Sequence, residues 1–237
     1  MQAVILAGGK GTRLRPYTTS LPKPLVPLGD HPILEILLRQ LSAQGFKDVI
    51  LSTGHLAELI EAYCGNGKKW GVRIRYAREE KPLSTAGGLR LIKGLKNNFL
   101  VVNGDVLTDM NFKSLYDFHK KNNAWATIGV VARESKVDYG VIEIGPRGAL
   151  AKYIEKPTLP YLVSMGVNVF DRRAVGAIKR GEPLGIPDLV LRLKAEKKKV
   201  LCLKSSARWL DIGRPDDYHA AQDIFESDPK RFLHARS

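Results

Sequence analysis

The stretch AVILAGGKGTRLRPYTTSLPKPL, residues 3–25, decides the fold because it joins an apolar run to a loop rich in glycine and basic residues. The run AVILA is typical of a strand that is buried on both faces of a sheet. Glycines let backbone N–H groups approach a phosphate closely, and nearby cations can neutralise its charge. The stretch therefore predicts a phosphate-binding loop after the first strand, with a solvated basic turn as the alternative.

Two common phosphate-binding loops do not fit this sequence. A Walker loop requires G-x-x-x-x-G-K-[S/T], which is absent here, and a dinucleotide fingerprint requires a third glycine where this chain continues with TRL (12–14). A second basic segment, PKPL (22–25), follows, and its prolines restrict the backbone on both sides of Lys23. The loop is thus expected to bind several phosphate charges, with Arg13 and Lys23 as its cations.

Short apolar runs alternate with helical patterns through the first half of the chain, and the second half contains consecutive strands separated by turns. This pattern predicts an α/β fold with three layers, in which helices cover both faces of a mainly parallel, mixed sheet. Strands are expected at 3–7, 48–53, 72–77, 99–105, 126–133, 139–145, 149–157, 161–170 and 199–204. Helices are expected at 32–45, 56–65, 86–95, 172–180, 187–196 and from Pro215 onward.

The charge of the chain raises the question of a nucleic-acid partner, because 38 basic residues face 24 acidic ones, for a net charge of +14. The basic residues are scattered, however, and no basic run has aromatic residues interleaved for base stacking. We therefore expect a small anionic ligand and no nucleic acid. The sequence contains no signal-peptide or membrane-helix pattern, so a cytoplasmic protein without a membrane partner is expected.

Six motifs in this chain resemble, in order, those of the sugar-1-phosphate nucleotidyltransferases, also called nucleotide-sugar pyrophosphorylases. They are LAGGKGTRLRP…PKPL (6–25), EEKPLSTAGGL (79–89), VVNGD (101–105), YGVIE (139–143), IEKP (154–157) and WLDIGRPDDY (209–218). The second motif looks closest to mannose-1-phosphate guanylyltransferases, and the short chain also resembles uridylyltransferases that act on N-acetylmuramate-1-phosphate. The resemblance implies the Rossmann-like nucleotidyltransferase fold.

The reaction implied by this resemblance is nucleotidyl transfer from a nucleoside triphosphate to a sugar 1-phosphate, with release of pyrophosphate. GTP with mannose- or heptose-1-phosphate is the expected pair, UTP or another triphosphate is the alternative, and a non-catalytic nucleotide-sugar sensor is the alternative class. The product is expected to serve the synthesis of cell-envelope polysaccharide. The cofactor implied is Mg²⁺, for which Mn²⁺ can substitute, held by Asp105 and Asp211, with Asp109 able to join through a water.

The resemblance also assigns the remaining site residues. Arg13, Lys23, Asp105 and Asp211 are the expected catalytic residues. The sugar phosphate is expected at Gly140, Glu155, Lys156 and Ser164. The nucleotide is expected at Leu6, Ala7, Gly8, Gly9, Gly11, Thr12, Arg13, Lys23, Pro82, Leu83, Thr85, Gly87, Gly88, Asn103 and Asp105.

Several of these residues have ordinary structural alternatives. Asp105 could cap the next turn, Thr85 could cap the helix that follows it, and the pair Glu155–Lys156 could be a solvated surface pair. Ser84 and Ser164 also depart from the family pattern, in which many relatives have glycine and asparagine at these positions.

A single domain is expected over residues 1–237. Residues 1–110 would form mainly the nucleotide-binding half, residues 111–226 mainly the sugar-phosphate half, and residues 227–237 a loose tail. No additional β-helical domain is expected, and a homo-oligomer is left open.

Overall fold

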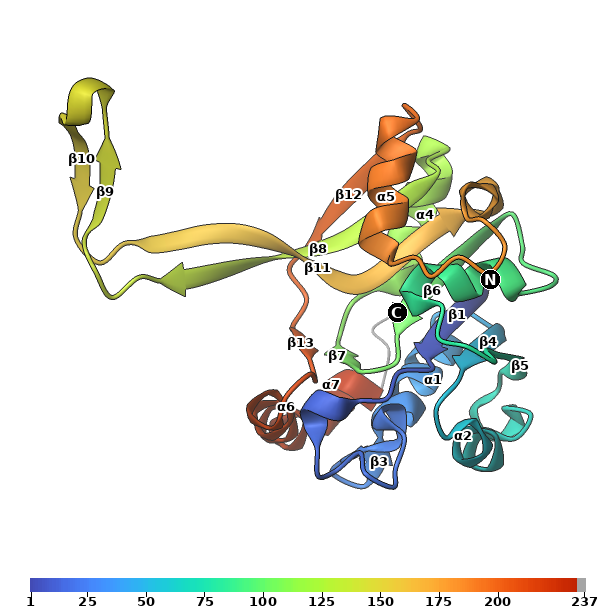
Figure 1. Ribbon diagram of the computed structural model, residues 1–237. Helices are drawn as coiled ribbons and strands as arrows, with labels where there is room; N and C mark the ends of the chain where they lie inside the picture. The colour runs from blue at the N-terminus through green and yellow to red at the C-terminus, as the bar shows by residue number, and fades with distance from the viewer. Residues whose placement is uncertain (234–237) are drawn as a thin grey trace.

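A seven-stranded mixed sheet runs through the protein (Figure 1). The structure is a computed structural model and describes residues 1–233. Four neighbouring strands are parallel, and β11 joins them to β8 through antiparallel pairings on both of its sides. From edge to edge the order is β12 (Val200–Ser205), β8 (Ala126–Lys136), β11 (Thr158–Asp171), β6 (Asn98–Asn103), β1 (Gln2–Ala7), β4 (Asp48–Thr53) and β5 (Arg73–Arg78).

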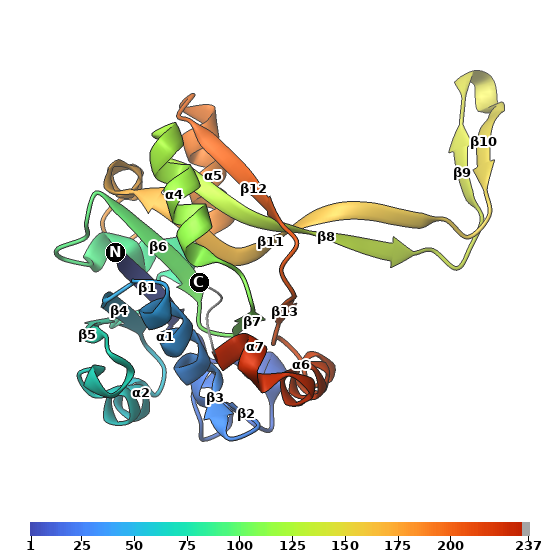
Figure 2. The same ribbon diagram turned by 180° about the vertical axis from the view of Figure 1, so that it is seen from behind.

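Helices cover both faces of this sheet, as Figures 1 and 2 show from opposite sides. Successive side chains of each apolar strand point to opposite faces of the sheet, so that Ile5 of β1 packs on one face and Val4 on the other. The first face is covered by α1 (Ile33–Ala43), α2 (Ala57–Cys64) and α4 (Phe112–Asn122). The second face is covered by α5 (Ile186–Ala195) and the short helices α3 (Ser84–Gly87), η4 (Gly88–Leu91) and η6 (Arg172–Ala177). The expected three-layer α/β fold is therefore confirmed.

The C-terminal segment packs against the first loop of the chain. Strand β13 (Trp209–Asp211) pairs antiparallel with β7 (Val106–Thr108) and leads into α6 (Pro215–Ser227) and α7 (Pro229–Leu233). Phe232 of α7 is fully buried in a cluster that also contains Leu14, and its carbonyl accepts a hydrogen bond from the Gln40 side chain at 2.8 Å. The expected loose tail is therefore wrong for residues 229–233, and residues 234–237 lie outside the described part.

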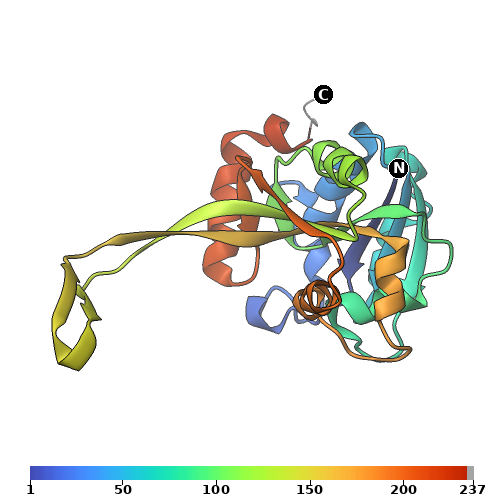
Figure 3. The ribbon, with the colours of Figure 1, turned by 90° about the horizontal axis from the view of Figure 1, so that it is seen from above.

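A long arm projects from the body of the protein (Figures 1 and 3). The outer parts of β8 and β11 form a two-stranded antiparallel ribbon, which is paired from Val130 and Ser164 out to Lys136 and Thr158. The ribbon ends in a hairpin made of β9 (Val141–Ile144) and β10 (Leu150–Ile154). We call residues 130–164 the arm.

The remaining elements are short. They are η1 (Thr12–Leu14), η2 (Lys23–Leu25), β2 (Pro27–Leu28), β3 (His31–Pro32), η3 (Lys68–Trp70) and η5 (Pro146–Gly148). Within residues 1–233, no helix is both long enough and apolar enough to cross a membrane.

Candidate active site

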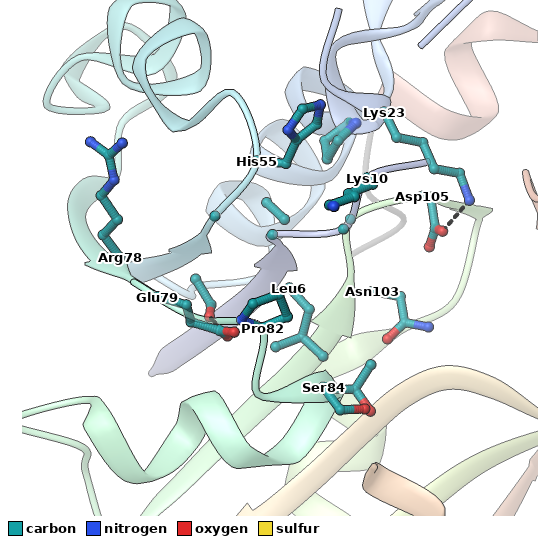
Figure 4. Close-up of a pocket in the computed structure, with 18 of the residues that line it drawn as sticks. Leu6, Lys10, Lys23, His55, Arg78, Glu79, Pro82, Ser84, Asn103 and Asp105 are labelled. Carbon is teal, nitrogen blue, oxygen red and sulfur yellow. Dashed lines mark hydrogen bonds and ion pairs between the residues drawn. The ribbon is translucent and has the colours of Figure 1, made fainter. Parts of the chain in front are cut away.

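A pocket of about 810 Å³ opens at the carboxyl ends of the four parallel strands (Figure 4). This is the edge at which open α/β sheets bind ligands, and the volume is within the range of small-molecule sites. Each of β1, β4, β5 and β6 ends in a loop that contributes to the lining. The lining residues are Leu6, Ala7, Gly8, Gly9, Lys10, Lys23, Pro24, Ser52, Gly54, His55, Arg78, Glu79, Glu80, Pro82, Ser84, Thr85, Asn103, Gly104 and Asp105.

The loops after β1 and β4 are in direct backbone contact at two glycines. A Cβ atom on Gly54 would lie 3.0 Å from the carbonyl oxygen of Gly8, and one on Gly8 would lie 3.3 Å from the nitrogen of Gly54. The same Gly8 carbonyl accepts a hydrogen bond from the backbone N–H of His55 at 3.3 Å. A side chain at either glycine would push the loops apart, so Gly8 and Gly54 allow the two loops to pack together in the lining of the pocket.

Asp105, Asp211 and Lys23 come together, although they are far apart in the sequence. Asp105 and Lys23 line one end of the pocket, and Asp211 lies close to both of them, outside the lining. Asp105 follows directly after β6, and its carbonyl accepts a hydrogen bond from the N–H of Ile212 at 3.0 Å. This bond, with the pairing of Asp211 opposite Val106, holds the two aspartates at the same edge. Lys23 lies between two prolines, is almost completely buried and forms an ion pair with Asp105 (Figure 4).

The two aspartates form a carboxylate pair that cations only partly compensate. Burial, and next the negative charge of Asp105, raises the pKa of Asp211, while Lys23 and Arg13 act in the opposite direction. Carboxylate oxygens are the ligands that Mg²⁺ prefers, and Mg²⁺ in phosphate sites usually takes one or two carboxylates together with substrate oxygens. The described residues contain no cluster of three or more metal-ligating side chains. The pair Asp105–Asp211 therefore fits Mg²⁺ as a site that substrate phosphates would complete.

Arg13 lies beside the carboxylate pair and does not line the pocket itself. It sits in η1, is exposed, and has its Nη1 atom 3.7 Å from the position that a Cβ on Gly213 would take. The Oδ2 atom of Asp211 is 3.2 Å from the same position. Gly213 thus leaves room for the Arg13 guanidinium and for the carboxylates of Asp211 and Asp217, all of which lie within 4 Å of that position. Gly11 and Thr12, in the same turn, also lie outside the lining.

The segment after β5 is organised by Glu79, which the sequence did not single out. Its carboxylate accepts hydrogen bonds from the backbone N–H of Leu83 at 3.0 Å and from the Ser52 hydroxyl at 3.3 Å. A Cβ atom on Gly88 would collide with this carboxylate, so Gly88 makes space for Glu79 and does not face the pocket. Pro82, Ser84 and Thr85 do line the pocket.

Gly87 and Leu83, both expected to contact the nucleotide, are buried in the protein and lie outside the pocket lining. A Cβ atom on Gly87 would collide with the carbonyl oxygen of Glu182, so this glycine allows close packing against residues 182–184. Thr85 accepts a hydrogen bond from the N–H of Ile186 at 2.9 Å. It therefore caps the start of α5 and not the helix that follows it in the sequence.

The four expected sugar-phosphate residues are split between two places. Ser164 lies at the base of the arm, where its hydroxyl is 3.5 Å from the backbone nitrogen of Gly166, and a Cβ on Gly166 would be 2.6 Å from the Asn103 amide. Gly140, Glu155 and Lys156 lie at the outer end of the ribbon, where the hairpin begins (Figure 1). The structure of this single chain does not bring these three residues to the pocket.

Asp109, the carboxylate expected to join the metal through a water, makes two contacts that hold the C-terminal segment. Its carboxylate accepts hydrogen bonds from the backbone N–H of Arg208 at 2.8 Å and from the Arg231 guanidinium of α7.

Four residues of the pocket lining were not predicted from the sequence: Ser52, Gly54, His55 and Arg78. The rule that ligands bind at the ends of parallel strands could have indicated the last three, because they follow β4 or end β5.

Comparisons with known proteins agree with this fold. Residues 2–228 match the family described as nucleotidyl transferase. The chain is 35% identical over 224 residues to mannose-1-phosphate guanylyltransferase from Mycobacterium tuberculosis, covering 92% of this chain and 62% of that protein. It is 33% identical over 241 residues to UTP–glucose-1-phosphate uridylyltransferase from Synechocystis, covering 93% of this chain and 62% of that protein.

The fold is also found in a solved structure. HddC from Yersinia pseudotuberculosis superposes on this chain with a TM-score of 0.73 at 25% sequence identity, covering 94% of this chain and 99% of that one. The chain thus spans about 62% of the length of these two curated relatives and nearly all of the HddC chain. The match over residues 2–228, together with these similarities, shows that this chain belongs to the nucleotidyl transferase family.

Proposed function

We propose that this chain transfers a nucleotidyl group from a nucleoside triphosphate to a sugar 1-phosphate, giving a nucleoside diphosphate sugar and pyrophosphate. The observation that carries the proposal is the convergence of Asp211 with Asp105 and Lys23, two residues that line the end of a nucleotide-sized pocket. The names of the mycobacterial and cyanobacterial relatives, which describe this class of reaction, support it.

The chemical step needs alignment more than it needs a reactive side chain. An oxygen of the sugar phosphate attacks the α-phosphorus, so that a new P–O bond forms. The bond from the α-phosphorus to the bridging oxygen breaks, and pyrophosphate leaves with the electron pair. Because the nucleophile is already an anion, neither a general base nor a covalent intermediate is required. The protein must hold two polyanions in line and neutralise their charge.

The cations near the pocket divide this task. We assign Lys23 to the α-phosphate and the incoming sugar phosphate, because it lies at the pocket's end beside Asp105. Arg13 is assigned to the β- and γ-phosphates and to the charge that grows on the leaving group. Asp105 and Asp211 would hold Mg²⁺, or Mn²⁺ in its place, which when bound supplies further neutralisation of phosphate charge.

The preferred pair under this proposal is GTP with a manno-configured sugar phosphate, either mannose- or heptose-1-phosphate. Its support is the similarity to the mycobacterial guanylyltransferase. The Synechocystis uridylyltransferase is nearly as similar, so UTP is the second candidate. We further propose that the protein works in the cytoplasm, that its product serves cell-envelope polysaccharide, and that it binds neither nucleic acid nor a membrane.

Pyrophosphate release with five triphosphates tests this proposal. GTP, UTP, CTP, dTTP and ATP are each combined with hexose- and heptose-1-phosphates in the presence of Mg²⁺. We expect GTP with a manno-configured phosphate to give the highest kcat/KM. A tenfold advantage for UTP would overturn the choice of base and leave the reaction class intact, because unpaired base edges cost about 1–3 kcal/mol. No release with any pair would favour a non-catalytic nucleotide-sugar sensor.

A further inference from the structure

Three residues at the outer end of the ribbon form a small preorganised cluster. The Tyr153 hydroxyl donates a hydrogen bond to the Glu155 carboxylate at 3.3 Å, and a Cβ atom on Gly140 would lie 2.6 Å from the same hydroxyl. Lys156 follows with a φ of 45°, a conformation that is uncommon for a lysine. The Glu155 carboxylate and the bare backbone of Gly140 thus lie together, with Lys156 next in the chain, and these are group types that bind hydroxyl groups and a phosphate. We call residues 137–140 and 155–157 the elbow.

This elbow and the nucleotide pocket are two incomplete halves of one site under the proposed function. Within residues 1–233, every residue that lines the pocket lies between Leu6 and Asp105, so the elbow supplies none of its lining. Nucleotidyl transfer requires the sugar phosphate and the α-phosphorus to meet within bonding distance. The elbow of one chain must therefore reach a pocket, either its own or that of another copy.

The ribbon that carries the elbow is not built to fold back. Seven consecutive residue pairs, from Val130–Ser164 to Lys136–Thr158, hold it together over about 20 Å. Its middle is tied to the body, because the Arg133 guanidinium lies 5.3 Å from the centroid of the Trp209 ring and donates a hydrogen bond to the Trp209 carbonyl. The Trp209 indole in turn donates to the Met165 carbonyl at 2.7 Å. Folding back within one chain would break these contacts or part of the ladder.

The hairpin beyond the elbow has one apolar face without a partner in its own chain. Ile142 is paired with Tyr153, and Ile144 with Leu150, so all four side chains lie on one face of the hairpin. Each of them is more than half exposed. The opposite face carries the ion pair of Lys152 with Glu143 at 3.6 Å. Eight of the twelve large exposed apolar side chains within residues 1–233 lie between residues 139 and 162. A two-stranded hairpin with this exposure needs a surface to cover it.

We propose that two copies of this chain exchange arms, so that the elbow of each copy completes the sugar-phosphate side of its partner's pocket. This inference rests on the proposed function, because it assigns Glu155 and Lys156 to the sugar phosphate. A second copy is the occupant because it offers the carboxylate pair and the phosphate loop that the elbow lacks. In a symmetric exchange, each pocket receives the elbow of the partner, and the apolar face of each hairpin is covered by the partner.

Complementation between two inactive variants tests the exchange. Lys23→Ala removes a pocket cation, and Lys156→Ala removes the elbow cation. The two variants are co-expressed with different tags, and the mixed dimer is purified through both tags. With exchanged arms, one site combines an intact pocket with an intact elbow, so about half of the wild-type kcat per dimer should return. A second mixed dimer combines a wild-type chain with a chain that carries both Lys23→Ala and Lys156→Ala. With exchanged arms, each of its two sites contains either an altered pocket or an altered elbow, so it should be nearly inactive.

If the elbow of each chain contributes to the pocket of the same chain, the activities of the two mixed dimers are reversed. That result would overturn the proposal. The first mixed dimer would then be inactive, and the second would keep about half of the wild-type activity. A wild-type protein that is monomeric at working concentration would overturn it as well. If Lys23→Ala does not fold, Asp211→Asn replaces it as the pocket variant, with the same expectations.

A measurement without substrate separates this inference from the proposed function. ¹⁴N- and ¹⁵N-labelled chains are mixed, allowed to exchange subunits, and treated with an amine-reactive cross-linker. Cross-links between Lys10 of the pocket and Lys156 should join chains of unlike label in about half of the products. Links found only within like-labelled chains would contradict the exchange, whatever the catalytic result. Mixed-label links in an inactive protein would support the exchange and refute the proposed function alone.

Discussion

Asp211 lies beside Asp105 because the backbone N–H that follows it donates to the Asp105 carbonyl, and the resulting charge pair raises the pKa of Asp211 together with burial. The two residues are separated by more than a hundred positions in the sequence, and this hydrogen bond and the pairing of β13 with β7 bring them together. Such like-charged pairs cost stability and are retained where a cation or a reaction needs them.

Asp211→Asn should therefore stabilise the free protein at neutral pH. An acid whose pKa is raised on folding costs stability wherever it is ionised, so its cost is present above the raised pKa and absent below the unfolded value. The variant should unfold at a higher Tm than the wild type at pH 7, and the difference should shrink as the pH falls towards 4. Millimolar Mg²⁺ should raise the Tm of the wild type and not that of the variant.

Thermal unfolding between pH 4 and pH 8, with and without Mg²⁺, measures both effects. Asp216→Asn is the matched control, because Asp216 is an exposed carboxylate in the first turn of α6. A variant that is less stable than the wild type at pH 7, or equal stabilisation of both proteins by Mg²⁺, would argue against the carboxylate pair as a metal site.

Arg13→Ala should lower kcat by at least tenfold and change the KM for the triphosphate much less. The charge that Arg13 faces grows on the leaving pyrophosphate, so its interaction is stronger in the transition state than in the ground state. Steady-state kinetics of pyrophosphate release give both constants. Arg15→Ala, which changes an exposed arginine two residues further on, serves as the control. An unchanged kcat with a raised KM would show that Arg13 contributes only to binding.

Gly87→Ala and Gly88→Ala should fail in different ways. At Gly87 the new methyl group would meet the backbone carbonyl of Glu182, which cannot move easily, so we expect a loss of about 1–3 kcal/mol in the free energy of unfolding. At Gly88 it would meet the Glu79 carboxylate, which can move, so the main effect should be a raised KM for the triphosphate. Denaturant unfolding and kinetics separate the two outcomes.

The control for these glycine variants is Gly176→Ala, since a Cβ there would have no heavy atom within 4 Å apart from its chain neighbours and the backbone of its own helix. It should leave stability and KM near the wild-type values. If Gly88→Ala lowers stability as much as Gly87→Ala and leaves KM unchanged, Glu79 does not organise the pocket in the way described above.

Phe232→Ala should cost about 3–5 kcal/mol, because it removes a fully buried aromatic side chain from the cluster that joins α7 to Leu14. Lys230→Ala, an exposed change in the same helix, should be nearly neutral. Urea unfolding of both variants measures the difference. Equal stability of the two variants would mean that α7 does not hold the first loop in place.

The sequence was informative where local pattern and strand order decide the structure. The run AVILA and the loop after it predicted the first strand and its place at the ligand-binding edge, and the three layers followed from the alternation of strands and helices. It was less informative where packing decides. The helix expected at 86–95 is interrupted because Gly87 packs against the chain near Glu182. Helix α4 was missed although Phe112, Leu115 and Tyr116 have helical spacing.

The direction of the arm could not be predicted from the sequence. The motifs at Gly140 and at Glu155–Lys156 indicate a sugar-phosphate site, but they do not say which pocket these residues reach. That direction depends on the continuous pairing of β8 with β11 and on the contact of Arg133 with Trp209, both of which are tertiary features. The burial of Phe232 is a similar case, because a short polar segment near the end of a chain is usually loose.

The fate of the α-phosphate tests nucleotidyl transfer most directly. The protein is incubated with GTP labelled at the α-phosphorus, with mannose 1-phosphate and Mg²⁺, and the products are separated by chromatography. We predict that the label appears in a nucleoside diphosphate sugar, that unlabelled pyrophosphate is released in equal amount, and that Asp211→Asn abolishes both. Label that remains in GTP, or that appears only in GMP or GDP, would contradict transfer to a sugar phosphate.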